Sequence, residues 1–422
     1  MLFIVFSNFF FGWAFQNFTI SFVPIVYVFL LILLLNSKLS TNLKILDDVG
    51  LLNIFIFYLI YNIGKLSINY FEYGLVAIRD GTFVLDSLFV LVSLSFFSSI
   101  ELTITKILKI CFLYSFMFIL FWFIRDNVIF LSPIITSPLG GQTNLFFNFS
   151  TINVTCGFFA FYSYLFLSSN NKKFFYFLFF LIFSLILLPK RMIYVWYISA
   201  FLYLFFIDKK NINFTFKLLL VFIVFYIIDL IGIFSIFKIK EINFFDFFKS
   251  HLLSTIPTYE ISNTDDFFVG TQSTVSWRID KWSMTISNVM STFNTFLFGL
   301  PFGVSLTDFY NMQGIQTREP HNLYITIFAR TGLIGSILFS ILHFKIIKIL
   351  YKVYKKSLIL KNQTINKLMI LFTIYVLFIF GGGGISSSIL SATYHSTQFY
   401  LFSGIWISIY LKILKDENLS NT

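Results

Sequence analysis

Long apolar runs separated by short polar connections dominate this chain. A helix that crosses a membrane needs about 20 mostly apolar residues, with about 17 as the lower limit. On this basis the pattern predicts twelve spans, several of them short. They lie near residues 2–15, 19–36, 49–64, 83–99, 107–124, 150–168, 174–188, 192–207, 215–234, 323–343, 368–381 and 396–411. We therefore expect an all-α, polytopic membrane protein.

Basic residues predict the orientation of these spans. The stretch from His343 to Lys367, after the tenth span, contains seven lysines and no acidic residue. Because lysine and arginine collect in cytoplasmic loops, we predict that this stretch is a cytoplasmic loop. Alternating the spans from it places 18 of the 30 basic residues, all of them lysines, and both termini on the cytoplasmic side.

One long polar segment interrupts the alternation of spans and short loops. Residues 235–322, 88 in all, contain six basic and eight acidic residues and amphipathic runs such as Ile279–Phe293. Long ordered loops commonly carry function, so we expect a partly helical cap on the outer side. The chain then divides into a membrane bundle of about nine spans (1–234), a large periplasmic loop (235–322) and a bundle of about three spans with a cytoplasmic tail (323–422).

Composition narrows the class of protein. The chain is 58% hydrophobic and 12% charged, whereas a soluble domain carries about 25% charged residues. This excludes a soluble enzyme, a nucleic-acid-binding domain and a disordered chain. Cys111 and Cys156 both lie in apolar runs, and the outer segments lack the usual metal-binding spacings. We expect no disulfide framework, no metal and no other cofactor.

Arginine and lysine are distributed differently. Of the 30 basic residues, 24 are lysines, and all six arginines fall on the predicted outer side or in the outer half of a predicted span. They are Arg79, Arg125, Arg191, Arg278, Arg318 and Arg330. Either cation orients a membrane protein, but arginine adds a planar fork that binds phosphate or carboxylate through two hydrogen bonds. The pattern predicts an outer cavity for an oxyanion, although Arg79 and Arg125 also have neighbouring aspartates that offer simple ion pairs.

Three charges lie within predicted spans, namely Asp86, Asp229 and Arg330. A charge at membrane depth costs several kcal/mol unless it is paired or hydrated. These residues either line the outer cavity, or Arg330 forms a buried pair with an aspartate that fixes helix packing.

Four short motifs follow one another near the end of the long loop. They are Ser276–Trp282 (Ser-Trp-Arg-Ile-Asp-Lys-Trp), Phe298–Gly303, Pro320–Tyr324 (Pro-His-Asn-Leu-Tyr) and Ala329–Gly335. In this order they resemble the O-antigen polymerase and ligase family of bacterial polytopic membrane glycosyltransferases. Leu188-Pro189-Lys190-Arg191 resembles a Ser-Arg turn of that family, with Lys190 in place of serine. Because positive charge in a tight outer turn opposes the inside bias, we interpret this pair as ligand-binding.

The resemblance implies a fold similar to that of the GT-C glycosyltransferases and a donor glycan carried on undecaprenyl diphosphate. In this interpretation, Arg191 and Arg278 stabilise the charge of the leaving diphosphate, and His321 removes the proton of the acceptor hydroxyl. Glu319 is a rival base, and a helix-capping role is the alternative for His321. The remaining candidates for substrate binding are Lys190, Arg318, Glu319, Asn322, Arg330, Lys281, Arg125 and Arg79.

The function implied by the resemblance is a polymerase of lipid-linked oligosaccharide repeat units for O-antigen or capsular polysaccharide. A ligase that transfers the glycan to the lipid A core uses the same donor, and a lipid-linked oligosaccharide flippase is a further alternative. The expected location is the bacterial inner membrane, with the active site facing the periplasm. Partners would be membrane lipid and the flippase and chain-length regulator of the same pathway, with no nucleic acid.

Overall fold

The protein is helical in the parts that the structure describes. The computed structural model describes residues 39–96, 105–113, 115–116, 119, 134–136, 142–144, 149–182, 191–207, 266–307, 319–386 and 393–420. Within them, strands β1 (Ile134–Thr136) and β2 (Gln142–Asn144) pair antiparallel, with Ile135 opposite Thr143. The predicted helical class is confirmed, with this short strand pair added. The predicted spans near 2–15, 19–36 and 215–234, and residues 235–265 and 308–318 of the long loop, lie outside the described residues.

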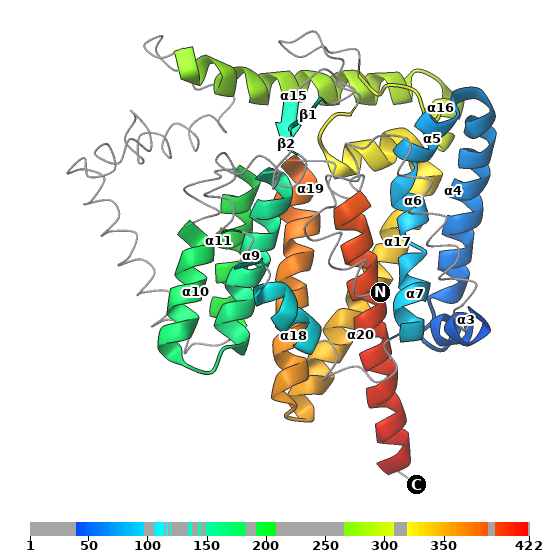
Figure 1. Cartoon of the computed structure of the whole chain (residues 1–422). Coiled ribbons are helices and arrows are strands. Elements are labelled where there is room, and N and C mark those ends of the chain that lie inside the picture. The colour runs from blue at the N-terminus through cyan, green and yellow to red at the C-terminus, as the bar shows by residue number, and fades with distance from the viewer. Residues whose placement is uncertain are drawn as a thin grey trace.

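The first described helices form one side of the bundle (Figure 1). They are α3 (Leu39–Asp48), α4 (Leu52–Tyr73), α5 (Leu75–Asp80), α6 (Thr82–Asp86) and α7 (Phe89–Phe96). Gly74 joins α4 to α5 with φ of 58°, a left-handed conformation that glycine adopts without steric cost. Within the span predicted near 83–99, α6 and α7 follow one another with a tight turn between them. At their junction, backbone amides donate hydrogen bonds to the carbonyl three residues earlier, as in a 3₁₀ turn. The Ser87 hydroxyl also donates to the Val84 carbonyl.

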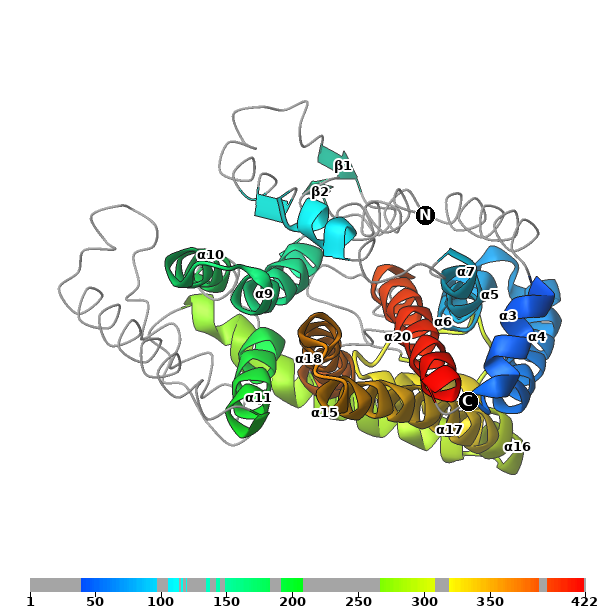
Figure 2. The same cartoon turned by 90° about the horizontal axis from the view of Figure 1, so that it is seen from below.

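Helices α9 (Phe149–Phe166), α10 (Asn170–Ile182) and α11 (Arg191–Ile207) form the opposite side. Three further helices are α17 (Leu323–Ile359), α18 (Gln363–Leu377) and α20 (Thr393–Ser420). Seen from below, they lie between the α9–α11 group and the α3–α7 group (Figure 2). Helix α15 (Asp266–Met290), followed by α16 (Phe293–Phe298), lies across one end of the bundle (Figure 1). The expectation of helical structure in the later part of the long loop is thus confirmed for these residues.

The longest helix is α17 (Leu323–Ile359), with 37 residues. It bends at Gly332, whose φ of 64° and ψ of −168° are not helical. The helix continues well past His343, so the predicted loop from His343 to Lys367 is wrong as secondary structure. Five of its lysines, at 345, 348, 352, 355 and 356, lie on α17. The first four recur every three or four residues and so share one face of the helix. A short turn then leads to α18.

After α17 the chain forms α18 (Gln363–Leu377), the π-helical turn η5 (Phe378–Gly382), α19 (Gly383–Ser386) and α20 (Thr393–Ser420). The Asn362 side chain begins α18 by accepting hydrogen bonds from the amides of Thr364 and Ile365. Gly381 departs from helical geometry with φ of −97° and ψ of −114°. The apolar run therefore bends at its glycines and continues, since Gln363–Ile385 forms one apolar helical stretch.

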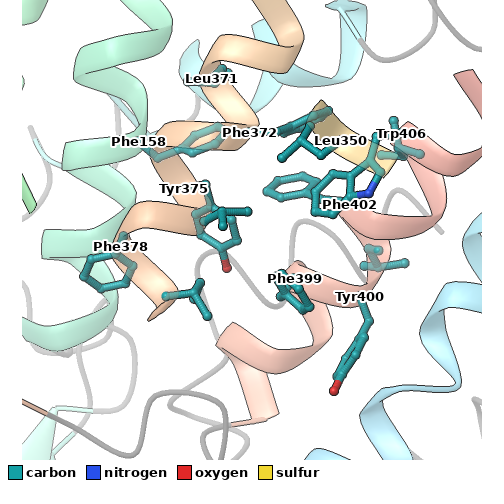
Figure 3. Close-up of a cluster of buried hydrophobic side chains, with 14 of the residues drawn as sticks. Phe158, Leu350, Leu371, Phe372, Tyr375, Phe378, Phe399, Tyr400, Phe402 and Trp406 are labelled. Carbon is teal, nitrogen blue, oxygen red and sulfur yellow. The ribbon is translucent and has the colours of Figure 1, made fainter. Parts of the chain in front are cut away.

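Aromatic side chains fill the centre of the bundle where α9, α18 and α20 meet (Figure 3). The ring of Phe402 stacks on Phe158 with centroids 5.7 Å apart and lies 4.9 Å from the centroid of Phe372. Trp196 of α11 donates from its Nε1 to the Ile374 carbonyl of α18 at 2.7 Å. Since offset and edge-to-face aromatic pairs contribute beyond their buried area, the phenylalanine-rich composition serves interior packing as well as lipid contact.

Three helical stretches of the described chain are long and apolar enough to cross a membrane, namely Leu52–Tyr73, Leu323–Ile359 and Gln363–Ile385. Shorter apolar helices accompany them at Thr82–Leu94, Cys156–Phe166 and Trp196–Ile207. Together with the composition, they make this a membrane protein. The count of twelve spans, their orientation and the periplasmic loop remain predictions.

Candidate functional site

One face of α15 carries the cations of the candidate site. Arg278, Lys281, Thr285 and Val289 recur every three or four residues, which places them on one side of a helix. The last three are fully buried, whereas Ile279 on another face is 42% exposed. Val289 packs with Leu306 and Ala329. A lysine on the buried face is unusual and indicates a role beyond packing.

The segment before α17 brings His321 to these cations. Its backbone φ of 54° is left-handed, which is uncommon for a residue other than glycine. The neighbouring Pro320 carbonyl accepts a hydrogen bond of 2.7 Å from Trp282 Nε1 of α15. Asn322 follows as the cap of α17, and its side chain accepts from the amides of Tyr324 and Ile325 at 3.0 and 3.1 Å.

Burial and mutual repulsion set the charges of the cluster of Arg278, Lys281 and His321. Burial, together with the positive charges of Lys281 and Arg278, lowers the pKa of His321 from 6.5 to about 4. Burial and the Arg278 charge lower the pKa of Lys281 from 10.5 to about 8, and burial lowers that of Arg278. At neutral pH the cluster therefore combines two cations with an uncharged imidazole.

Part of this cluster lacks a protein partner. Within the described part of the chain, the Nε atom of Arg278 is buried without a hydrogen-bond partner. A buried donor left unsatisfied is costly, and like charges held together add to that cost. A bound anion would remove both penalties at once, so the cluster has the chemistry of an oxyanion site.

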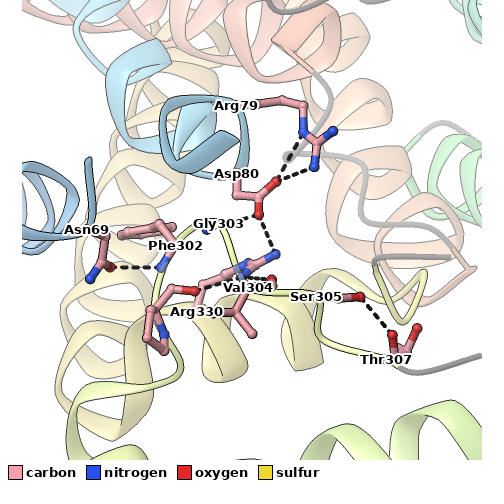
Figure 4. A network of polar contacts seen from close by, with 10 residues as sticks. Asn69, Arg79, Asp80, Phe302, Gly303, Val304, Ser305, Thr307 and Arg330 are labelled. Carbon is pink, nitrogen blue, oxygen red and sulfur yellow. Dashed lines mark hydrogen bonds and ion pairs between the residues drawn. The ribbon is translucent and has the colours of Figure 1, made fainter. Parts of the chain in front are cut away.

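Arg330 lies in a different setting, a network of polar contacts (Figure 4). Its side chain is fully buried and donates to Asp80 at 2.8 Å, to the Pro301 carbonyl at 3.0 Å and to the Val304 carbonyl at 2.7 Å. Asp80 also pairs with Arg79 at 3.0 Å. Both ion pairs that the sequence left open as alternatives, Arg330 with an aspartate and Arg79 with its neighbour, are therefore present.

These contacts hold the turn around Gly299–Gly303. The Gly303 amide donates to Asp80 at 3.1 Å, and the Phe302 amide donates to the Asn69 side chain at 2.8 Å. Gly299 lies so close to Gly332 that a Cβ atom on it would be 2.5 Å from the Gly332 nitrogen. Glycine is thus required at both positions for the backbones to meet.

The bend of α17 at Gly332 leaves carbonyl groups that other residues bind. Lys65 of α4 donates to the Arg330 carbonyl at 2.6 Å and to the Phe298 carbonyl. Tyr61 donates to the Thr331 carbonyl at 2.7 Å, and the Leu300 amide donates to the Ala329 carbonyl at 2.7 Å. No role was predicted for Lys65 from the sequence. A single lysine within the apolar helix α4 is costly unless it is paired, and this could have indicated its role.

The remaining predicted site residues are described to different extents. Lys190, Arg318 and Arg125 lie outside the described residues, and Arg191 is described by its backbone alone, as the first residue of α11. Glu319 is half-buried next to Pro320. The structure thus brings together Arg278, Lys281 and His321, with Asn322 as a helix cap and Arg330 and Arg79 in the neighbouring network.

Other buried ionisable groups lie deeper in the bundle. Asp86 is fully buried and accepts a hydrogen bond from the Ser396 hydroxyl, while His343 Nε2 lies 3.0 Å from the Tyr400 hydroxyl. The third predicted charge, Asp229, lies outside the described residues. Within the described residues, no group of three or more His, Cys, Asp or Glu side chains is placed to hold a metal ion. Cys111 and Cys156 are buried free thiols.

Fold and site together define a membrane-embedded helical protein with a cationic cluster where α15 meets the start of α17. Residues 176–340 match the family model described as O-antigen ligase. The resemblance seen in the sequence is confirmed over these residues, which are similar to the O-antigen polymerase and ligase family. The matched range includes Arg278, Lys281 and His321. No curated protein matches the chain in sequence.

Proposed function

We propose that the protein polymerises lipid-linked oligosaccharide repeat units at the outer leaflet of the inner membrane. It would transfer a glycan from undecaprenyl diphosphate to the hydroxyl group of an acceptor sugar. The observation that carries this proposal is the convergence of Arg278 and Lys281 of α15 with His321 before α17. Such a site offers positive charge to a diphosphate and an uncharged base to an acceptor.

In the proposed reaction, the bond between the anomeric carbon and the diphosphate oxygen breaks, and the diphosphate keeps the electron pair. Arg278 and Lys281 stabilise the charge that grows on that oxygen, because preorganised cations in a partly buried site need little reorganisation. The acceptor oxygen forms the new bond to the anomeric carbon and loses its proton to His321. Arg191 is a second candidate for the diphosphate, as predicted from the sequence.

The low pKa of His321 fits this sequence of events. Without a substrate, the two neighbouring cations keep the imidazole uncharged and make it a weak base. A bound diphosphate offsets their charge, so the pKa of His321 rises towards the range in which proton transfer is efficient. The base then becomes strong only when the donor is in place.

Arg330 and Arg79 would act less directly. Their contacts with Asp80 support a role in holding the turn around Gly299–Gly303 next to the site. Lys190, Arg318, Glu319, Asn322 and Arg125 remain sequence-based candidates for substrate binding. In this proposal the reaction needs no metal, since arginine and lysine neutralise the diphosphate.

The divergence of the chain favours polymerase over ligase. The family model matches residues 176–340, which include the four short motifs, and the rest of the chain resembles the family only in hydropathy and loop placement. Each polymerase must fit its own repeat unit, so its sequence is expected to diverge outside the shared motifs. The partners would then be the flippase that supplies the donor and a chain-length regulator.

Purified full-length protein in lipid nanodiscs tests the proposal. Supplied with undecaprenyl-diphosphate-linked repeat units and a chelator, it should produce a ladder of longer glycans. Transfer to a lipid A core acceptor without a ladder would identify a ligase. Transbilayer movement of a labelled donor in liposomes, without elongation, would identify a flippase.

A further inference from the structure

The peptide unit between Pro320 and His321 is held from outside its own segment. The Pro320 carbonyl and the His321 amide belong to one planar group, so fixing the carbonyl oxygen fixes the orientation of the whole plane. Trp282 supplies that restraint, since its Nε1 donates to the Pro320 oxygen at 2.7 Å across 38 residues of sequence.

The conformation of His321 depends on this plane. Rotation about the bond between its nitrogen and Cα is φ, and the observed value of 54° lies in a region that side chains other than glycine rarely adopt. Strained backbone of this kind persists where surrounding contacts determine it, often at functional sites. On the other side of His321, the cap made by Asn322 fixes the start of α17. His321 is therefore held between two restraints.

The same helix carries both the restraint and the cations. Trp282 directly follows Lys281 and lies one helical turn after Arg278. Three residues further along, Thr285 donates from its hydroxyl to the Leu306 carbonyl at 3.1 Å. Helix α15 thus binds the backbone at both Leu306 and Pro320, and its rigid spacing relates the position of His321 to that of the two cations.

We propose that Trp282 is a positioning residue for His321. Its indole N–H orients the Pro320–His321 peptide and thereby directs the imidazole to the side of α15 on which Arg278 and Lys281 lie. The inference rests on the proposed function, because it gives Trp282 a task only where His321 acts as the base. The aromatic body of Trp282 contributes packing, and its N–H contributes the orientation.

The substitution Trp282→Phe separates these two contributions. It keeps most of the ring and removes the N–H. We expect kcat to fall about 10- to 100-fold, as for a misplaced catalytic group, while KM for the lipid-linked donor changes by less than about twofold because the cations remain. Glycan elongation by the purified full chain in nanodiscs gives both constants.

Trp196→Phe is the matched control. It removes an indole bond of the same length, 2.7 Å, from Nε1 to a helix carbonyl, but between α11 and α18. It should lower the melting temperature at least as much as Trp282→Phe does and leave kcat nearly unchanged. Thr285→Val provides a second control on α15. It removes the hydrogen bond to the Leu306 carbonyl and keeps the bond from Trp282 to Pro320. Equal kcat values for all three variants would overturn the inference.

A double-mutant comparison separates this inference from the proposed function. If Trp282 acts through His321, then adding Trp282→Phe to His321→Ala lowers activity no further. Full activity of His321→Ala alone would refute the role of His321 as base. An inactive His321→Ala together with a fully active Trp282→Phe would refute the inference alone. If Trp282→Phe does not fold, benzothienylalanine at position 282 has nearly the shape of tryptophan and no N–H, and the same outcomes apply.

Discussion

Two arginines near the start of α17 have opposite surroundings. Arg330 is fully buried and donates to the carboxylate of Asp80 and to two backbone carbonyls. Arg278 lies beside Lys281 and His321, and its Nε is buried without a hydrogen-bond partner within the described residues. Both carry the same guanidinium group. The difference lies in whether the protein itself supplies the negative charge.

This contrast separates two uses of arginine in a membrane protein. A buried arginine with its own carboxylate fixes helices relative to each other, and its loss appears as lost stability. An arginine among other cations lowers stability until an anion arrives, so its benefit appears as binding and catalysis. Substitutions in the two regions should therefore change different measured quantities.

The largest expected effect is on stability, in the network of Arg330. Asp80→Ala leaves the buried guanidinium without this carboxylate and should lower the free energy of unfolding by about 3–5 kcal/mol. Thermal unfolding in detergent measures the change. The control is Asp48→Ala, which removes an exposed carboxylate at the end of α3 and should cost less than about 0.5 kcal/mol. Equal losses in the two variants would contradict a structural role for the pair.

The glycine contact next to this network should give the second effect. In Gly332→Ala the new Cβ would lie 2.3 Å from the Leu297 oxygen, at a residue with φ of 64°. Steric overlap and left-handed strain together should cost about 2–4 kcal/mol of unfolding free energy. Gly64→Ala in α4 meets nothing within 4 Å and should leave stability unchanged or raised. A Gly332→Ala variant as stable as Gly64→Ala would rule out a required backbone contact.

Substitutions in the cationic cluster should lower activity and change stability little. Arg278→Lys keeps the charge and removes the planar fork, so we expect kcat/KM for the lipid-linked donor to fall about 10- to 100-fold, or about 1.4–2.7 kcal/mol. The melting temperature should change little. Arg191→Lys is expected to behave in the same way. Wild-type turnover in Arg278→Lys would refute the argument from two-point binding, and the matched Arg330→Lys should lose stability instead.

The smallest expected effect is a shift in pH dependence. In the proposed mechanism the uncharged form of His321 is the active one, so its pKa of about 4 would put the acid limb of kcat/KM near that pH. Lys281→Gln removes one cation that lowers this pKa, so the limb should move to higher pH by up to about one unit. In the wild type, the acid limb of kcat should lie at higher pH than that of kcat/KM, because the bound diphosphate raises the pKa of His321. Identical limbs in variant and wild type would argue against His321 as the base.

Sequence patterns predicted the helical membrane class and the local helices well. The apolar runs near 150–168 and 192–207 correspond closely to α9 and α11, and the amphipathic run Ile279–Phe293 lies on α15 and the start of α16. Errors arose where local geometry overrides hydropathy. A hydropathy profile does not detect the tight turn at Ser87. It also predicts that α17 ends where the lysines begin, although the helix continues to Ile359.

The site was harder to predict, because its members meet across long sequence distances. The spacing of Arg278 and Lys281 is local and visible, but their approach to His321 was suggested by family resemblance alone. The pairing of Arg330 with Asp80 spans 250 residues, and no local pattern selects that aspartate. The lowered pKa of His321 depends on burial and on charges from another helix. The sequence motif included Trp282, but its bond to Pro320 became apparent only from the folded structure.

The bend at Gly332 determines where His321, the proposed base, lies relative to the axis of the bundle. Had α17 continued straight, the nine residues Leu323–Thr331 would have raised His321 by about 13 Å along the helix axis. The bend instead lays this arm across the end of the bundle (Figure 1). In the proposed orientation, this end of the bundle faces the outer leaflet. A donor held by its lipid tail would reach the base without leaving the membrane surface.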